Sequence, residues 1–127
     1  EGVRWFGFAP LGELLARSAA FVHHGGIGSS AQALAAGVPQ LIRPLAFDQF
    51  DNATRLRRLG VAEELLPARF KAPAVAAALG RLLKSAEVRS ACDRAAARCD
   101  ADGALEAACD ALEARLVVPT VGAPGSA

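Results

Sequence analysis

The residues of this sequence whose types and spacing could do chemistry are a histidine, three glycines and a serine that lie close together. They are His24, Gly25, Gly26, Gly28 and Ser29. Glycines let a chain turn sharply and leave backbone N–H groups accessible to a ligand. If a strand ends before this group and a helix begins after it, several N–H groups lack acceptors and the positive end of the helix dipole faces the same point. The group therefore indicates a site for a phosphate or a diphosphate.

The flanking residues predict the elements that such a site needs. Residues 20–23 are apolar up to the histidines and predict a short buried strand. An alanine-rich segment follows the glycines and predicts a helix. Ser29 and Gln32 have the spacing of a capping box, and Gly37 suits the left-handed position after the last helical turn. Residues 40–43 then predict the next strand.

The glycine turn on its own leaves a second interpretation open. It is neither a G-x-G-x-x-G sequence nor a Walker A sequence, because no lysine follows the glycines. The missing G-x-G-x-x-G spacing makes a Rossmann dehydrogenase the weaker assignment. The alternative to an anion site is a tight turn between a strand and a helix, with glycines present for their positive φ.

The rest of the chain continues the alternation of strands and helices. Further strands are expected at residues 3–8 and 61–66, and further helices at 13–18, after Asp48 or Asp51, at 74–84, after Ser85, and around Leu105 to Leu116. Gly60 is expected to end one helix and Gly103 to interrupt another. Alternation at this spacing predicts right-handed crossovers and a parallel sheet, so the fold class is α/β, a partial Rossmann-like sheet followed by C-terminal helices.

Composition and charge narrow the function classes. The chain has 127 residues, enough for one core, and a net charge of +1, which favours neither nucleic acid nor an anionic membrane. Its three cysteines, Cys92, Cys99 and Cys109, do not make a metal pattern and are expected to be small core residues. The sequence begins within a strand-like run, so earlier strands of the sheet are expected before Glu1.

Several separated motifs, in this order, resemble the donor-binding signature of family 1 glycosyltransferases. They are Phe8-Ala9-Pro10, the stretch from His23 to Leu41, Asp48-Gln49 and Asn52-Ala53. The sequence looks most similar to bacterial members, which include sterol and lipid glucosyltransferases, the rhamnosyltransferase of rhamnolipid synthesis, and macrolide and glycopeptide transferases. The resemblance covers residue 8 to about residue 62. It implies the C-terminal, donor-binding half of a two-domain GT-B enzyme.

The resemblance also assigns roles by position. It places the nucleobase at Phe8 and Ala9, the diphosphate at His24, Gly25, Gly26, Gly28 and Ser29, the ribose at Gln32, and the sugar hydroxyls at Asp48 and Gln49. Three positions depart from the family. Phe8 stands where plant members have tryptophan, Gly28 where they have asparagine, and Gln32 where many members have glutamate.

Each assignment has a purely structural alternative. His24 could be a hydrogen-bonded core histidine, and His23 is interpreted as structural. Gln32 could serve only as the partner of Ser29 in a capping box, and Asp48 could be a plain N-cap. Phe8 could be an ordinary strand residue.

The resemblance implies a function and a set of partners. The expected ligand is a nucleotide diphosphate sugar, a UDP- or dTDP-hexose, and the expected partner is an acceptor-binding N-terminal domain or chain. The family reaction is inverting and transfers the sugar to a hydroxyl, here of a lipid or small molecule. The base lies in the other domain, so no catalytic residue, metal or cofactor is assigned here.

Expected domain bounds, an expected location and two alternative functions complete this interpretation. The α/β core is expected at 1–66, a helical segment of the same domain at 67–118, and a disordered tail at 119–127. The expected location is the cytoplasm, with peripheral attachment to the inner membrane through a lipid acceptor. The alternatives are a non-catalytic nucleotide-sugar-binding subunit of a split transferase and an inactive fragment that serves as a scaffold.

Overall fold

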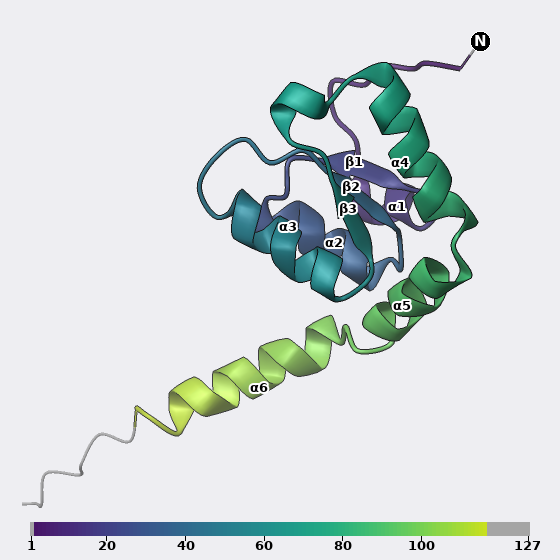
Figure 1. Cartoon of the computed structure of the whole chain (residues 1–127). Helices are drawn as coiled ribbons and strands as arrows, with labels where there is room; N and C mark the ends of the chain where they lie inside the picture. The colour runs from purple at the N-terminus through teal and green to yellow at the C-terminus, as the bar shows by residue number, and fades with distance from the viewer. Residues whose placement is uncertain (1, 117–127) are drawn as a thin grey trace, which may run out of the picture.

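A three-stranded parallel sheet forms the centre of the molecule, which confirms the predicted α/β class (Figure 1). The computed structural model describes residues 2–116. The strands are β1 (Phe21–His23), β2 (Gln40–Ile42) and β3 (Ala62–Glu64), in the order β1-β2-β3. Phe21 pairs with Gln40, and Gln40 pairs with Ala62. Because all three strands run in one direction, their carboxyl ends meet at one edge of the sheet.

The central strand divides the core into two faces. Leu41 and Ile42 are both fully buried, and successive residues of a strand point to opposite faces. Ile42 packs with residues of α3 (Gln49–Arg58) and α5 (Ala86–Ala96), with α2 (Ile27–Ala35) adding Leu34. Leu41 packs instead with α4 (Ala72–Lys84). The sheet is therefore covered by helices on both faces, as parallel sheets generally are.

The remaining elements complete this body. The short helix α1 (Leu11–Leu15) places Leu15 against Ala33 and Val38, next to α2. The 3₁₀ turn η1 (Pro67–Arg69) connects β3 to α4. The predicted division of the chain at residue 66 stays a prediction, and the predicted disordered tail at 119–127 lies outside the described residues.

The strand expected at residues 3–8 is wrong, because the structure has no strand within residues 2–20. Val3, Trp5 and Phe8 are 98%, 88% and 84% exposed. Aromatic and β-branched residues favour a strand only when a neighbouring strand and a buried face are there to receive them. Without those partners, the run stays irregular.

Most of the residues predicted to begin or end a helix do so in the structure. Gly37 and Gly60 follow α2 and α3 with φ of 64° and 78°, which confirms both as helix stops. Ser85 caps α5, since its hydroxyl accepts a hydrogen bond from the Val88 N–H. The expected interruption at Gly103 is wrong. This glycine lies in the first turn of α6 (Ala101–Glu113), where its N–H donates to the Asp100 carboxylate.

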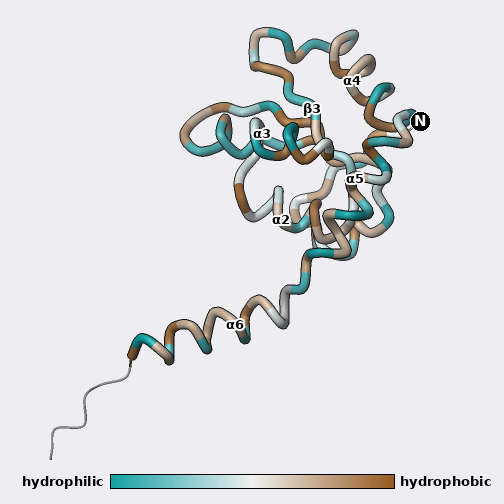
Figure 2. Tube along the Cα trace, turned by 60° about the horizontal axis from the view of Figure 1, so that its bottom comes forward, coloured by the Kyte–Doolittle hydropathy of each residue, from teal (hydrophilic) through white to brown (hydrophobic). Residues whose placement is uncertain are grey.

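The last helix extends away from the body of the molecule (Figures 1 and 2). Residues 104–116 are all exposed, including Leu105, Leu112 and Leu116. The expectation of three buried cysteines is therefore only partly right. Cys92 is buried under α2 and α3, whereas Cys99 and Cys109 are exposed. A helical stripe of small and apolar residues predicts packing only when another element lies beside it.

Within residues 2–116, the helices are too short or too polar to cross a bilayer.

Candidate functional site

The site begins where β1 ends, at a glycine that no other residue could replace without strain. Gly25 has a φ of +91°, which L-residues rarely adopt. A Cβ atom on Gly25 would lie 2.9 Å from Ile42 Cγ2 and 3.1 Å from the carbonyl oxygen of Gln49. The turn is thus packed tightly between the end of β2 and the start of α3.

His23 fixes this turn through both ring nitrogens. The Gly25 N–H donates to Nδ1 at 3.0 Å, so Nδ1 is an acceptor and the ring proton is on Nε2. Nε2–H in turn donates to Gln40 Oε1 at 2.9 Å. Burial, with a smaller contribution from His24, lowers the pKa of His23, although the bond to Gln40 opposes this. His23 is therefore a neutral, structural residue.

The helix after the turn starts earlier than the sequence predicted. Its N-cap is Gly26, which has an extended backbone, and its first residue is Ile27. The predicted N-cap at Ser29 and its capping box with Gln32 are therefore wrong, because Ser29 is already the third helical residue. Nothing in the sequence distinguishes a capping serine from a serine in the first turn when a glycine stands just before it.

This start leaves a group of backbone donors at the helix end. The first helical hydrogen bond runs from the Ser30 N–H to the Gly26 carbonyl at 3.0 Å. The N–H groups of Ile27, Gly28 and Ser29 come before it, and no backbone acceptor within residues 2–116 pairs with them. A Cβ atom on Gly28 would meet nothing within 4 Å. The end of α2 therefore combines bare donors with open space.

His24 stands beside these donors. Its side chain is exposed, which excludes the alternative that it is a core histidine. A Cβ atom on Gly26 would lie 2.6 Å from His24 Nε2, so the ring lies directly against the N-cap residue. His24 and the first turn of α2 can therefore contact one ligand together.

Hydrogen bonds join the start of α3 to the glycine turn. Asn52 Nδ2 donates to the Gly25 carbonyl at 3.0 Å and to Asp48 Oδ2 at 2.9 Å. Gln49 Oε1 accepts the N–H groups of Leu45 and Ala46, at 2.8 and 3.2 Å. Asp48 and Gln49 are thus held next to the turn, as their assignment to one ligand requires.

Two details of this segment were missed by sequence reasoning. Asp48 occupies the N-cap position of α3, as one alternative had it, but its backbone is helical and its side chain makes no capping bond. Asn52 is the residue that connects the two segments. Its spacing from Asp48, four positions along a predicted helix, was the available signal for this contact.

The other assigned residues lie less closely together. Gln32 is exposed and lies one turn beyond the N-terminus of α2. Phe8 is 84% exposed and Ala9 is half-buried. No hydrogen bond or hydrophobic cluster within residues 2–116 joins Phe8 to the glycine turn. The nucleobase contact therefore stays a prediction.

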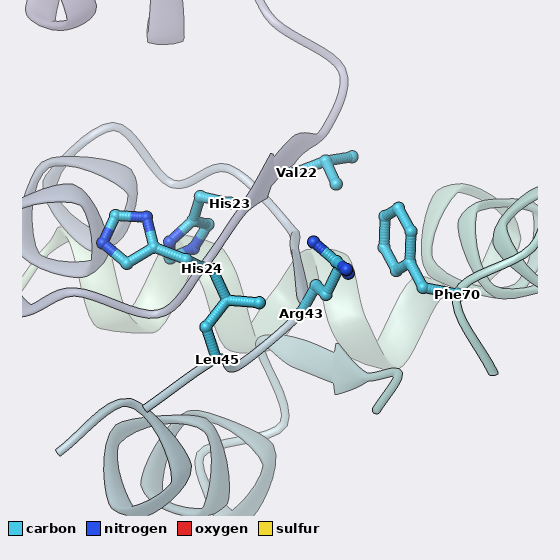
Figure 3. Close-up of a pocket in the computed structure, with 6 residues that line it drawn as sticks. All are labelled: Val22, His23, His24, Arg43, Leu45 and Phe70. Atoms are coloured by element: carbon cyan, nitrogen blue, oxygen red, sulfur yellow. The ribbon is translucent and has the colours of Figure 1, made fainter. Parts of the chain in front are cut away.

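A hollow borders the site on the α4 side, at the same edge of the sheet (Figure 3). Its walls are Val22, His23, His24, Arg43, Leu45 and Phe70. The Arg43 guanidinium carbon lies 5.4 Å from the centre of the Phe70 ring, a cation–π distance. Arg43 immediately follows β2 but belongs to none of the motifs quoted above, so sequence reasoning passed over it.

Taken together, the carboxyl edge of the sheet offers N–H donors, a helix dipole, an exposed imidazole and a guanidinium. Each of these favours an oxyanion. Within the described part of the chain, no three His, Cys, Asp or Glu side chains lie close enough together to hold a metal ion.

The sequence is similar to a known protein family over most of its length. Residues 1–113 match the family described as erythromycin biosynthesis protein CIII-like, C-terminal domain. The O-mycaminosyltylonolide 6-deoxyallosyltransferase of Streptomyces fradiae is 38% identical over 101 residues, which is 79% of this chain and 24% of that protein. The chain therefore spans about a quarter of the length of this relative.

Solved structures agree with the sequence comparison. The glycotransferase of kitacinnamycin superposes with a TM-score of 0.78 at 29% identity, covering 85% of this chain and 28% of that one. The glycosyltransferase VinC in complex with dTDP superposes with a TM-score of 0.74 at 30% identity, covering 87% of this chain and 29% of that one.

Proposed function

This chain belongs to the erythromycin biosynthesis protein CIII-like C-terminal domain family and has the fold of GT-B glycosyltransferase C-terminal domains, and on that premise we propose that it binds a nucleotide diphosphate sugar. The diphosphate lies at the N-terminus of α2, where Gly26, Gly28 and Ser29 surround it. His24 contacts it from the side. The sugar hydroxyls lie at Asp48 and Gln49, and the ribose lies near Gln32.

The observation that carries this proposal is the start of α2. Its first N–H groups have no backbone acceptor within residues 2–116, Gly28 faces open space, and the His24 ring lies against Gly26. A diphosphate supplies acceptors for these donors and a negative charge for the helix dipole. Asn52 supports the arrangement, because it ties the Gly25 carbonyl to Asp48 and so couples the diphosphate end of the site to the sugar end.

Two relatives support a more specific proposal for the donor. One structure of similar fold holds dTDP, and a relative is named for the transfer of a 6-deoxyallosyl group. We therefore favour a dTDP- or UDP-linked hexose, with deoxyhexoses first, over a particular likeness to sterol glucosyltransferases or the rhamnolipid enzyme. The acceptor is the hydroxyl of a small molecule or a lipid.

The complete reaction needs more than this chain provides. Here the donor is held while an acceptor-binding domain or partner chain supplies a base that deprotonates the acceptor hydroxyl. The oxygen then attacks the sugar C1 with inversion, and the N–H groups of α2 together with His24 stabilise the charge on the departing diphosphate.

The direct test is a titration of the chain with dTDP and UDP, followed by backbone amide shifts. Shifts should cluster at residues 25–32, with smaller changes near Asp48 and Gln49. Shifts confined to other regions, or no shifts at all, would contradict the proposal.

A variant refines this test. His24→Ala should weaken binding of UDP far more than binding of uridine, because the ring is proposed to contact phosphate. A charge-assisted contact of this kind contributes roughly 1.5–3 kcal/mol. Arg94→Gln, an exposed position on α5, serves as the matched control and should bind both ligands as the unmodified chain does. Equal losses for uridine and UDP would assign His24 to another role.

A further inference from the structure

Arg43 differs from every other arginine that the structure describes. Of the arginines within residues 2–116, it alone is half-buried, while the others are exposed. Its backbone is fixed at the carboxyl edge of the sheet, because its N–H donates to the His23 carbonyl at 2.9 Å. The backbone of Arg43 is thus fixed next to the end of β1, while its side chain points away from the His23 and His24 rings, toward Phe70 (Figure 3).

The Arg43 side chain lacks a protein acceptor. Its Nε atom is buried and makes no hydrogen bond within the described residues. The guanidinium lies over the Phe70 ring, and Val22 lines the same hollow (Figure 3). Phe70 packs against the cluster around Leu41, so the stacking partner is itself held in place. A buried donor without an acceptor is costly, and a charged one more so. The two terminal nitrogens of Arg43 are not among the buried unpaired atoms and form no ion pair within residues 2–116, so they are the donors that an anionic ligand can reach.

No carboxylate from the neighbouring strand neutralises this charge. The two acidic residues of β3 are Glu63 and Glu64, and both are engaged elsewhere. Glu63 forms an ion pair with Arg81 of α4, and Glu64 forms one with Arg57 of α3. Arg43 appears in none of the ion pairs found within residues 2–116. The positive charge of Arg43 in the wall of the hollow is therefore not neutralised by these carboxylates.

The hollow is continuous with the proposed donor site, because His24 also lines it. We propose that Arg43 is an additional oxyanion ligand for the nucleotide sugar donor. The inference rests on the proposed function and extends it. A guanidinium presents a planar pair of N–H groups that matches a phosphate or a carboxylate. The oxyanion is accordingly either a phosphate of the diphosphate or a carboxylate on the sugar.

Isothermal titration of the chain with UDP, pyrophosphate and uridine tests the inference. If the oxyanion is a phosphate, Arg43→Gln should weaken UDP and pyrophosphate binding about tenfold or more and leave uridine unchanged, since a hydrogen bond to a charged group is worth about 1.5–3 kcal/mol. Arg43→Lys should recover part of the lost affinity, because lysine keeps the positive charge but lacks the planar pair of N–H groups. Arg58→Gln, an exposed arginine of α3, is the control and should change nothing.

A second arm identifies the source of the oxyanion. If the partner is a carboxylate on the sugar, Arg43→Gln should leave UDP binding intact and remove a preference for UDP-glucuronate over UDP-glucose. If the partner is a phosphate, both sugars should lose affinity equally. Either result supports the inference. Unchanged affinity for every anionic ligand, or an equal loss for uridine, overturns it.

Two further measurements keep the result decisive. If Arg43→Gln does not fold, as judged by urea unfolding, Phe70→Leu takes its place. It removes the ring under the guanidinium and should weaken UDP binding about twofold to fivefold, as expected for loss of a cation–π contact. Loss of UDP binding in His24→Ala rejects this inference and leaves the proposed function standing, if the Arg43 variants also keep full affinity for UDP, pyrophosphate, UDP-glucose and UDP-glucuronate. An unmodified chain that binds neither UDP nor pyrophosphate overturns both.

Discussion

The helices α2 and α5 begin in opposite ways. At the start of α5, Ser85 Oγ accepts the Val88 N–H at 3.2 Å, and at the start of α6, Asp100 Oδ1 accepts the Gly103 N–H at 3.0 Å. At the start of α2, the N-cap is Gly26, which has no side chain to offer. The helices α5 and α6 each satisfy one of their end donors with a side chain, whereas the first N–H groups of α2 have no backbone acceptor within residues 2–116.

A bare helix end is not sufficient to mark a site, and α4 shows why. It too begins without a side-chain cap, after Lys71, but Pro73 in its first turn has no N–H to leave unpaired. The difference is in the surroundings. Among the helices of residues 2–116, only α2 combines the bare end with a glycine that faces open space and an exposed imidazole against its N-cap. An uncapped helix start therefore indicates a binding site only when open space and polar side chains lie next to it.

The largest expected change in stability comes from a substitution in the glycine turn before α2. Gly25→Ala places a methyl group 2.9 Å from Ile42 Cγ2 at a φ of +91°. The strained φ and the overpacking each cost about 1–3 kcal/mol, so the free energy of unfolding should fall by about 2–6 kcal/mol. Urea unfolding measures this change.

Gly28→Ala is the matched control for this turn, because its methyl group would meet no protein atom. Its stability should stay within about 1 kcal/mol of the unmodified chain. Its affinity for UDP should nevertheless fall, since the methyl group enters the space proposed for the diphosphate. Equal destabilisation by both substitutions would contradict the difference drawn between the two glycines.

A smaller change in stability is expected from removing a serine at the start of a capped helix, α5, and none from removing one in the uncapped helix α2. Ser85→Ala removes a cap and should lower the free energy of unfolding by about 0.5–2 kcal/mol without changing UDP binding. Ser29→Ala removes a hydroxyl that caps nothing and should leave stability nearly unchanged while weakening UDP binding. Thermal unfolding with and without UDP distinguishes them. If Ser29→Ala proved as destabilising as Ser85→Ala, the serine would have the capping role that the structure denies it.

The smallest effect concerns pH. The folded pKa of His23 is below its ordinary value of 6.5, chiefly because of burial. Its contribution to stability is therefore complete above about pH 6.5 and is lost as the pH falls through the lower folded pKa, because only the unfolded chain then binds the proton readily. The free energy of unfolding should decrease from about pH 7.5 to about pH 5.5. His23→Gln should flatten this decrease, and His24→Gln should keep most of it.

The sequence predicted the elements around the site well. Strands around residues 20–23 and 40–43, the helix stops at Gly37 and Gly60, and the cap at Ser85 all depend on local chemistry, which a sequence displays directly. Glycine after a helical pattern and a serine before one act within a few residues. The order of the strands followed because alternating strands and helices permit few arrangements.

The errors occurred where a residue's role depends on contacts distant in the sequence. The strand expected at residues 3–8 had the right composition but no neighbour. Ser29 had the right type for a cap, but the turn closed one step earlier at Gly26, because Gly25 packs against Ile42 and Gln49. Arg43 gave no sign of its burial, since the Phe70 ring that holds it comes from a later segment.

The projecting helix α6 has a consequence for how the molecule opens. Residues 104–116 are all exposed, and an isolated helix of this length is marginally stable in water. Its amide hydrogens should therefore exchange with solvent through local fraying, while those of the fully buried strand β2 exchange only when the whole body unfolds. The chain consequently behaves as two cooperative units of unequal stability, and a single unfolding temperature describes only the one that contains the sheet.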